Sequence, residues 1–454
     1  MLSQFIQHIT GAANPAAALK TVTAPVLTTT STSAPAPLST TDSTAPALRT
    51  VKLIMVTAAN NNKYYEMHET ASGTFTVSYG RVGGSVSTAT YPMDQWDKKF
   101  REKVAKGYVD QTHLYADKPA MTSTDSIEND QVRALMAKLM EYANQSIFQN
   151  YVVSAQQVTK QQVDAAQQLL NELATLIDAR LDVSRYNDKL LSLFKTIPRK
   201  MGKVSQHLVP QSPQAPGDLQ TLRDRLAAEQ DTLDVMRSQV ELNQPKSDAN
   251  SPEQAPPSLL NSLGLTMEPV TDDRVLTLIK RMMGDDAAKF DAAFAVQQAR
   301  TQAAFVKHMS TAKTPKTQLL WHGSRSENWL SILKSGLVLR PTNAIITGKM
   351  FGYGIYFADQ FSKSLNYTSL SGSFWAGGQQ REAYLAIYEV HVGKQFVVRQ
   401  HEGWHCTLTG DVLAKRNPSL DSVYAQRGKS LLKNEFIVYN QDQSTIRYLV
   451  RVKL

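Results

Sequence analysis

Three short stretches in the last third of the chain place titratable or hydroxylated side chains at the ends of apolar runs. They are 320–325, 348–359 and 433–439. In the first, His322 and Gly323 follow an apolar run, so an imidazole lies beside backbone that no side chain shields. Such a pair is a suitable clamp for a planar amide. In the third, Glu435 opens a β-like run, which would hold its carboxylate on a rigid element at a cleft edge.

Each of these stretches also has an ordinary structural interpretation. A histidine before a glycine is more often a turn residue, and a glutamate at the start of a strand is usually solvated. The second stretch contains Gly348, Gly352 and Gly354, which would allow close approach of a ligand, but a Gly-x-Gly pattern alone is weak evidence for phosphate binding. The order and context of the three stretches are more specific than any one of them.

Charge and cysteine content narrow the possible classes of function. The 454 residues carry a formal charge of +9, and Cys406 is the single cysteine, which excludes a disulfide framework and multi-cysteine zinc modules. Residues 310–454 hold 18 basic and 9 acidic residues, so the whole basic surplus lies there. This surplus is either a solvated surface or a cleft for a phosphate-bearing small molecule. No stretch approaches the roughly 18 to 20 apolar residues that span a bilayer, so no membrane association is expected.

The N-terminal residues 1–47 are predicted to be a disordered tail. The first 50 residues contain 11 Thr, 10 Ala and 5 Pro and show no helical or strand period. These residues contain very few Asp and Glu, as mitochondrial transit peptides do. Such peptides are rich in arginine, however, and Lys20 is the only basic residue among the first 48.

Residues 48–118 change to a β-like texture. Apolar alternation predicts strands at 51–56, 63–67 and 74–79, separated by turns at 60–62 and 72–73. A helix is predicted from Met93 to Lys106, with Gly107 as its stop. The expected architecture is a small antiparallel sheet packed by one helix.

Residues 122–242 are predicted to form an all-α bundle. They contain almost no glycine, and helices are expected at 132–142, 159–177, 186–196 and 218–242. Ile197-Pro198 should end the third of these helices. Residues 243–257, which include four Pro and two Ser, are predicted to be a linker. Taken alone, the bundle would suit a scaffold, a partner-binding domain or a lid.

Residues 258–454 mix one helix with many β runs. The helix is expected at 273–283, and strands at 317–321, 384–392, 394–398, 436–439 and 446–452. Turns separate most of these runs, which favours an α+β domain dominated by antiparallel strands. The whole chain is therefore expected to be a multidomain α+β protein.

With the segments in place, the three stretches resemble the His, Tyr and Glu motifs of the poly(ADP-ribose) polymerase catalytic domain. That domain has the diphtheria-toxin-like ADP-ribosyltransferase fold, and the match continues through Ser362 to Tyr367. Residues 122–242 resemble the family's helical regulatory domain, and 48–118 resemble a WGR domain. The resemblance implies a transferase that uses NAD⁺ as its substrate and no metal.

The resemblance assigns roles to individual positions. His322 corresponds to a histidine that bonds a ribose hydroxyl of NAD⁺, and Gly323 to the residue whose backbone pairs with the nicotinamide carboxamide. Ser364 corresponds to a hydroxyl that bonds the same amide. Tyr367 and Tyr356 correspond to the rings on either side of nicotinamide.

Five further positions take roles in the same way. Glu435 corresponds to the catalytic glutamate, which stabilises the oxocarbenium-like ribose and, in polymerising members, positions the acceptor hydroxyl. Lys363 corresponds to a lysine beside that glutamate, while Ser324 and Asn328 lie where adenosine contacts are expected. Break-dependent members carry an arginine where this chain has Val338. Either Arg340 replaces it, or adenosine is bound differently.

The WGR-like segment implies DNA ends or strand breaks as partners. Its signature reads Tyr79-Gly80-Arg81, with Tyr in place of Trp, and a tyrosine keeps a stacking face while Arg81 can reach a phosphate. Lys98 and Lys99 belong to a basic cluster on the predicted helix, which is either a solvated face or a phosphate contact.

These inferences lead to a DNA-dependent poly-ADP-ribosyltransferase acting on proteins, including itself. The alternatives are a mono-ADP-ribosyltransferase and a non-catalytic scaffold that binds DNA or NAD. The family implies residence in the nucleus if the source is eukaryotic, and in the cytoplasm otherwise.

Overall fold

The computed structural model describes residues 48–112, 124–153, 155–178, 181–210, 216–242, 258–339, 350–373 and 377–454. The tail predicted at 1–47, the linker predicted at 243–257 and Arg340 lie outside the described residues. The domain boundaries stay predictions, because several of their ends fall on residues that are not described.

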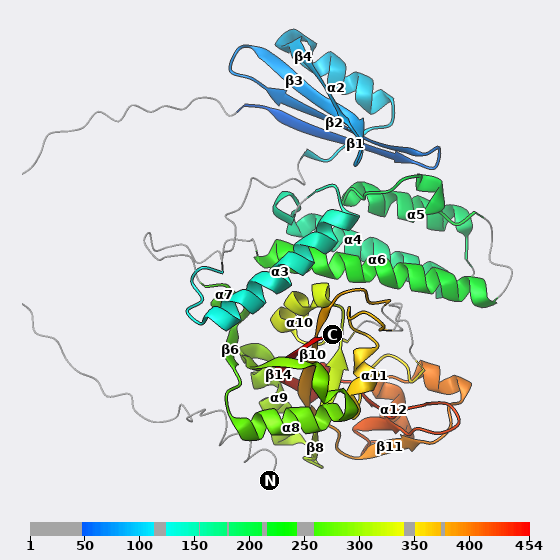
Figure 1. Cartoon of the computed structure of the whole chain (residues 1–454). Coiled ribbons are helices and arrows are strands. Elements are labelled where there is room, and N and C mark those ends of the chain that lie inside the picture. Colours follow the sequence, from blue (N-terminus) through cyan, green and yellow to red (C-terminus); the bar gives the residue numbers. More distant parts are fainter. Residues whose placement is uncertain are drawn as a thin grey trace, which may run out of the picture. The chain divides into compact units, whose positions relative to one another are not determined.

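The first described segment is an antiparallel sheet with one helix against a face (Figure 1). Its strands, in the spatial order β4-β3-β2-β1-β5, are β1 Thr50–Thr57, β2 Asn61–Glu69, β3 Thr74–Arg81, β4 Val86–Pro92 and β5 Val109–Asp110. Because side chains alternate across a strand, Leu53, Met67 and Phe75 share the face that is buried under helix α2, Trp96–Ala105. The rings of Phe75 and Trp96 meet edge to face, with centroids 5.0 Å apart.

The three predicted strands and the helix of this segment are confirmed, but two strands were not predicted. Strand β4 has no buried side chain and contains three small polar residues, so it carries little apolar alternation and forms by pairing with β3. The turn predicted at 60–62 is shorter than expected. Asn60 adopts a positive φ of 64°, whereas Asn61 already begins β2.

Four helices follow: α3 Asp130–Asn150, α4 Lys160–Asp178, α5 Val183–Thr196 and α6 Pro216–Leu242. All four were predicted. Helix α3 begins at a capping residue, since Asn129 Oδ1 accepts the backbone N–H groups of Gln131 and Val132 at 3.0 and 3.1 Å. It continues beyond its predicted end because Ile147 adds another buried contact. Helix α5 ends before Ile197-Pro198, as expected.

The last segment contains two sheets. The first has the strand order β6-β7-β14-β10-β8, and the second β11-β12-β13-β9. Their strands are β6 Leu265–Pro269, β7 Phe290–Gln298, β8 Thr317–Gly323, β9 Ile355–Phe357, β10 Glu382–His391, β11 Gln395–Val398, β12 Ser422–Ala425, β13 Glu435–Val438 and β14 Ser444–Lys453. The helices are α7 Leu259–Leu263, α8 Asp273–Met283, α9 Ala299–Thr311, α10 Trp329–Ser335, α11 Phe361–Leu365 and α12 Gly410–Arg416. Every ladder is antiparallel except β11–β12, so the predicted α+β class is confirmed.

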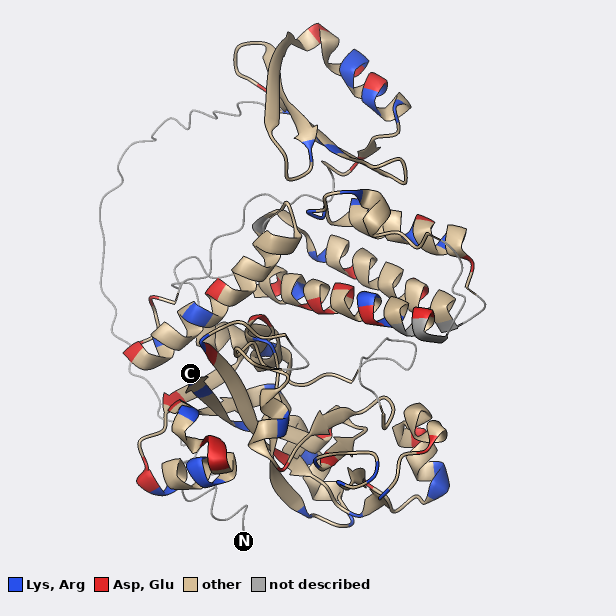
Figure 2. Ribbon diagram, turned by 45° about the vertical axis from the view of Figure 1, so that its right-hand side comes forward, with Lys and Arg blue, Asp and Glu red and all other residues tan. Residues whose placement is uncertain are grey.

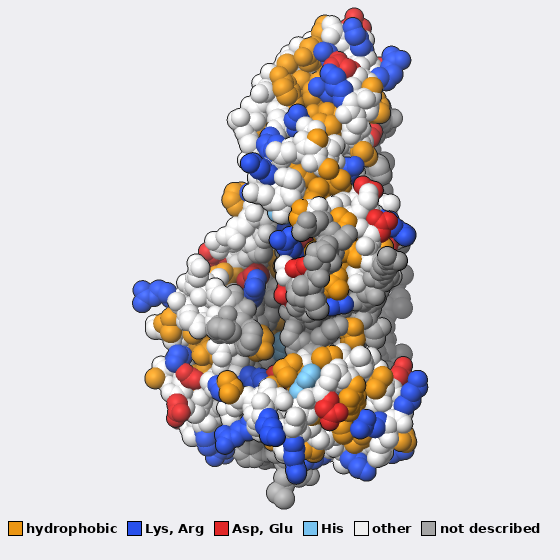
Figure 3. All heavy atoms as spheres, turned by 90° about the vertical axis from the view of Figure 1, so that its right-hand side faces the viewer, with side chains coloured by type: hydrophobic (Ala, Val, Ile, Leu, Met, Phe, Trp, Pro, Cys, Tyr) orange, Lys and Arg blue, Asp and Glu red, His pale blue; other side chains and the backbone are white. Residues whose placement is uncertain are grey.

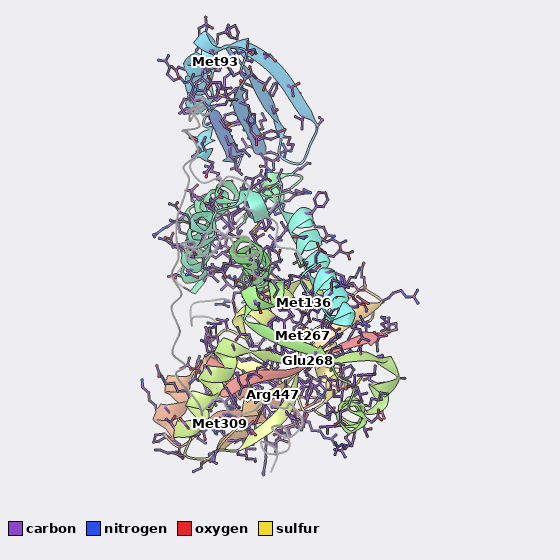
Figure 4. The ribbon with its side chains drawn as sticks, turned by 90° about the vertical axis from the view of Figure 1, so that its left-hand side faces the viewer. Met93, Met136, Met267, Glu268, Met309 and Arg447 are labelled. Atoms are coloured by element: carbon purple, nitrogen blue, oxygen red, sulfur yellow. The ribbon has the colours of Figure 1, made fainter. Side chains whose placement is uncertain are left out.

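A continuous apolar core joins the helices to the first of these two sheets. Met136 of α3 and Met267 of β6 are both buried in it, and both are labelled in Figure 4. Acidic and basic positions are interspersed along α6 (Figure 2). On the face drawn in Figure 3, Lys and Arg side chains are spread among polar and apolar ones rather than gathered in one patch.

Candidate active site

Glu435 is a buried carboxylate whose two oxygens have different surroundings. It opens β13, and its side chain is only 11% exposed. Lys363 Nζ lies 2.6 Å from Oε1, whereas Oε2 is buried and accepts no hydrogen bond within the described part of the chain. A buried anion requires a cation and hydrogen-bond donors to remain ionised. Lys363 supplies the first, and a ligand hydroxyl at Oε2 would supply the second.

Two lysines hold the segment around Glu435 in place. Lys363 Nζ also donates to the backbone carbonyl of Lys433 at 3.3 Å, and Lys433 Nζ donates to Ser362 Oγ at 2.6 Å. The residue before the glutamate is fixed too, because Asn434 Nδ2 donates to Asp359 Oδ2 at 2.7 Å. These bonds tie the start of β13 to α11 and thereby set the direction of the carboxylate.

Tyr356 lies on the neighbouring strand, where β9 pairs with β13 and Tyr356 stands opposite Ile437. Its hydroxyl donates to the Gly352 carbonyl at 2.9 Å and accepts the Phe351 N–H at 3.0 Å. Burial, with smaller contributions from Tyr439 and Glu435, raises the pKa of the phenol far above its usual range. The hydroxyl is therefore engaged by the backbone and stays protonated, which does not suit it to proton transfer.

His322 is oriented by a backbone carbonyl. Its Nδ1 lies 3.0 Å from the Tyr356 carbonyl, which can only accept, so Nδ1 carries the proton. Burial lowers the pKa of the imidazole, which outweighs the opposing effect of that hydrogen bond. The ring is therefore neutral at pH 7, and its Nε2 can accept a hydrogen bond from a ligand hydroxyl. This is the chemistry expected at a ribose.

Gly323 ends β8 at a point where no side chain fits. A Cβ there would lie 1.9 Å from the Ser364 carbonyl oxygen, so the backbones of β8 and α11 touch. Ser364 is 5% exposed. Tyr367 follows α11 and is 42% exposed, and burial together with the charge of Glu435 raises its pKa to about 12. The Tyr367 N–H donates to the Ser364 carbonyl at 3.1 Å. Gly323 and Ser364, predicted to bond the amide, and Tyr367, predicted to stack on nicotinamide, are thus close together.

A cleft of about 660 Å³ opens beside these residues. Its wall includes five of the predicted positions: His322, Gly323, Ser324, Asn328 and Tyr367. Asn328 Nδ2 donates to Ser324 Oγ at 3.1 Å, which joins the two positions predicted to contact adenosine. Glu435, Lys363, Ser364 and Tyr356 are linked to this wall by the contacts described above. The roles of all these residues remain predictions, and Arg340 lies outside the described residues.

The opposite wall of the cleft was not predicted from the sequence. It consists of polar side chains of α4 and α6: Gln167, Asn171, Gln230, Asp231, Asp234 and Arg237. Gln167 and Gln230 exchange amide hydrogen bonds of 2.7 and 2.8 Å, which ties the two helices together. Their spacing along each helix indicates a polar face, but helical periodicity cannot say what that face will meet.

The residues predicted to contact DNA differ in whether they already have partners within the protein. Arg81 donates from Nη1 to the Asn60 carbonyl at 2.9 Å, and from Nη2 to Asn60 Oδ1 at 2.9 Å and to the Gly202 carbonyl at 2.5 Å. Its guanidinium thus joins the β1–β2 turn to the helical segment. Lys99 Nζ lies 4.4 Å from the centre of the Tyr91 ring, while Lys98 is exposed. Tyr79 is 38% exposed. Their contact with DNA stays a prediction.

Among the described residues, no group of three or more His, Cys, Asp or Glu side chains is arranged to hold a metal ion. No helix in the same residues is long and apolar enough to cross a membrane.

Titration of His322 predicts a specific pH dependence. The neutral ring accepts the ribose hydroxyl, so activity should be lost when the ring is protonated. Because the pKa of His322 lies below the usual 6.5, we expect kcat/KM for NAD⁺ to stay flat on acidification through pH 6.5 and to fall only below that value. Initial rates of nicotinamide release between pH 5 and 8 test this. A fall that begins above pH 6.5 would contradict it.

Comparison with known proteins gives two family matches. Residues 275–454 match the poly(ADP-ribose) polymerase catalytic domain, and residues 50–114 match the WGR domain. A putative poly(ADP-ribose) polymerase-like protein, 100L, of invertebrate iridescent virus 6 is 36% identical over 166 residues, which are 35% of this chain and 83% of the viral protein. Rice poly(ADP-ribose) polymerase 2-A is 41% identical over 152 residues, 30% of this chain and 23% of the rice protein. Human poly(ADP-ribose) polymerase 2 is 35% identical over 158 residues, 30% of this chain and 26% of the human protein.

Proposed function

This chain belongs to the poly(ADP-ribose) polymerase family of NAD⁺-dependent ADP-ribosyltransferases, and on that premise we propose that it builds ADP-ribose chains on proteins in response to DNA ends. The observation that carries the proposal is the buried Glu435 carboxylate, with Lys363 on one oxygen and the other oxygen without a protein donor among the described residues. Acceptor proteins are expected to include the enzyme itself.

The chemistry follows from charge. When the bond between nicotinamide and C1′ of the ribose breaks, nicotinamide leaves with the electron pair and the ribose develops oxocarbenium character. The carboxylate of Glu435 stabilises that cation and orients a ribose hydroxyl. His322 Nε2 accepts a hydrogen bond from a second ribose hydroxyl, and the region of Gly323 and Ser364 holds the amide of the leaving nicotinamide. The acceptor oxygen then forms a bond to C1′, and an acceptor hydroxyl gives up its proton to solvent in this step.

Chain elongation requires the catalytic carboxylate to position a hydroxyl of a previously attached ADP-ribose. Glu435 is a glutamate, which supports elongation over the transfer of single units. The test is incubation with labelled NAD⁺ and sizing of the product on a gel. A ladder supports polymerisation, whereas one unit per site would support the mono-ADP-ribosyltransferase alternative.

Control by DNA is proposed to act through the helices that line the cleft. The WGR-like sheet contacts the segment before α6 through Arg81 and Asn60, and α6 lines the cleft opposite His322. A DNA end bound to the sheet would loosen this packing and admit NAD⁺. Automodification should therefore be faster with a 5′-phosphorylated nicked duplex. Equal rates with and without the duplex would overturn the proposal.

One ion pair ties the helices to the wall of the cleft and gives a sharper prediction. Lys334 Nζ of α10 lies 2.9 Å from Glu241 Oε2 of α6, and both side chains are partly exposed. Such pairs contribute up to about 1 kcal/mol, so Glu241→Gln should raise the DNA-independent rate by up to about fivefold and leave the DNA-stimulated rate unchanged.

Initial rates of nicotinamide release with and without duplex measure this effect. Glu172→Gln is the matched control, because Glu172 pairs with Lys189 at 2.5 Å within the helices and away from the cleft. An equal rise in both variants would mean that general loosening of the bundle, and not this contact, controls access.

A further inference from the structure

The helical region contains a second cavity, separate from the NAD⁺ cleft. It measures about 300 Å³ and lies between α5, α6 and the segment around His207. Its apolar lining consists of Leu190, Phe194, Val209, Leu222 and Leu226, all of them buried. The volume lies at the lower end of the range of about 300–1,000 Å³ for small-molecule sites.

Three polar groups in the lining make no hydrogen bond to a described residue. One is the hydroxyl of Tyr186, a residue that is 2% exposed. The others are the imidazole of His207, whose ring packs on Phe194, and the guanidinium of Arg225, which is exposed to solvent. Burial raises the pKa of Tyr186 to about 12, so its hydroxyl remains a donor. No protein group among the described residues accepts from this hydroxyl, so it is available to donate to a ligand in the cavity.

The sign of the ligand's charge follows from the other charged side chains. Glu229 also lines the cavity, but Arg199 Nη1 lies 3.1 Å from its Oε2 and neutralises it. Arg225, which is exposed at the mouth of the cavity, is the remaining charged residue of the lining. An anion would satisfy its guanidinium, and a carboxylate matches that planar fork especially well.

We propose that this cavity binds a small aromatic carboxylate. The ring lies among Phe194, Leu222 and Leu226, the carboxylate pairs with Arg225, and the hydroxyl of Tyr186 donates to the same anion. Nothing in the proposed ADP-ribosyl transfer uses these residues.

The position of the cavity makes such a ligand a regulator, and this part rests on the proposed function. Helix α6 presents Leu222, Leu226 and Glu229 to the cavity and its next turns to the NAD⁺ cleft. The segment that carries His207 begins with Gly202, which Arg81 contacts. A ligand that binds only this packing stabilises it by mass action. It would therefore hold the helices closed and lower the response to DNA.

The test measures binding of 2-naphthoate to the full chain by isothermal titration calorimetry, with the neutral 2-naphthalenemethanol as the matched probe. We expect naphthoate to bind at least tenfold more tightly than the alcohol. Arg225→Ala should weaken the binding of naphthoate by about ten- to a hundredfold, and Tyr186→Phe should weaken it by about fivefold. Ala228→Trp should block the cavity, since Ala228 lines it and is exposed, so a larger side chain there leaves the core intact.

Two control variants separate this cavity from other sites. Arg223 lies on α6 but does not line the cavity, and Arg237 lines the NAD⁺ cleft instead. Arg223→Ala and Arg237→Ala should bind naphthoate as the unmodified chain does. Absence of binding, equal binding of the two probes, or full binding by Arg225→Ala and Ala228→Trp would overturn the site.

The regulatory part is tested separately, by DNA-stimulated nicotinamide release with naphthoate present. The regulatory role is supported if naphthoate slows release severalfold in the unmodified chain and does not slow it in Ala228→Trp. Equal slowing in both would overturn it. If the enzyme releases no nicotinamide under any condition, the proposed function fails, while the calorimetric result on the cavity still stands.

Discussion

Glu435→Gln is expected to lower the rate of nicotinamide release by about a hundred- to a thousandfold and to abolish polymer formation. The substitution keeps the shape of the side chain and removes its charge. Stabilisation of developing charge by one preorganised group is worth about this much in related chemistry. Because the carboxylate acts mainly in the transition state, kcat should fall far more than KM for NAD⁺ rises.

A second buried glutamate provides the control for this variant. Glu389 is 4% exposed and pairs with Arg447 Nη2 at 2.7 Å, but it lies on β10 away from the cleft. Glu389→Gln should lower the melting temperature and leave the rate per folded molecule nearly unchanged. If Glu435→Gln kept more than a tenth of the activity while folded, the catalytic role assigned to it would be wrong.

Gly323→Ala is expected to cost activity and stability together. Its new methyl group would meet the Ser364 carbonyl at 1.9 Å, and since that neighbour is backbone, β8 and α11 must move apart. Overpacking of this kind costs about 1–3 kcal/mol of folding free energy. The movement separates groups predicted to hold nicotinamide, and a displacement near 1 Å lowers rates by about a hundredfold. Thermal unfolding and kcat/KM for NAD⁺ measure the two effects.

A glycine with free space beside it serves as the matched control. A Cβ at Gly403 would meet no atom within 4 Å, and its backbone does not have a positive φ. Gly403→Ala should therefore leave both the melting temperature and kcat/KM unchanged. If Gly323→Ala behaved in the same way, the close contact between β8 and α11 would not be a requirement of the active site.

Much of the fold could be predicted because its signals are local. Helices α3 to α6 and α8 follow from apolar spacing, and strands such as β8, β10 and β14 from runs of apolar residues bounded by turns. Strand β4 was missed for the complementary reason. None of its side chains is buried, and its conformation depends on pairing with β3.

The candidate site divides in the same way. The motif pattern alone indicated His322, Tyr356 and Glu435, together with the family and its substrate. The resemblance also placed Lys363 near that glutamate, and the structure gives the contact as 2.6 Å to Oε1. The sequence contained no sign that the Tyr356 carbonyl orients His322, because the two residues are far apart in the chain and only the tertiary structure brings them together.

The sequence by itself thus determined which chemical groups are present and that His322 and Glu435 lie at the ends of strands, since both depend on residue type and short spacing. It did not predict β9 or α11, the short elements that carry Tyr356 and Lys363. The tertiary structure decided which oxygen of Glu435 faces a cation, which helix face lines the cleft, and that Arg81 also contacts the helical segment. These features arise from packing between segments separated by tens of residues or more. Periodicity within one segment records that a face is polar or apolar, but not what that face will meet.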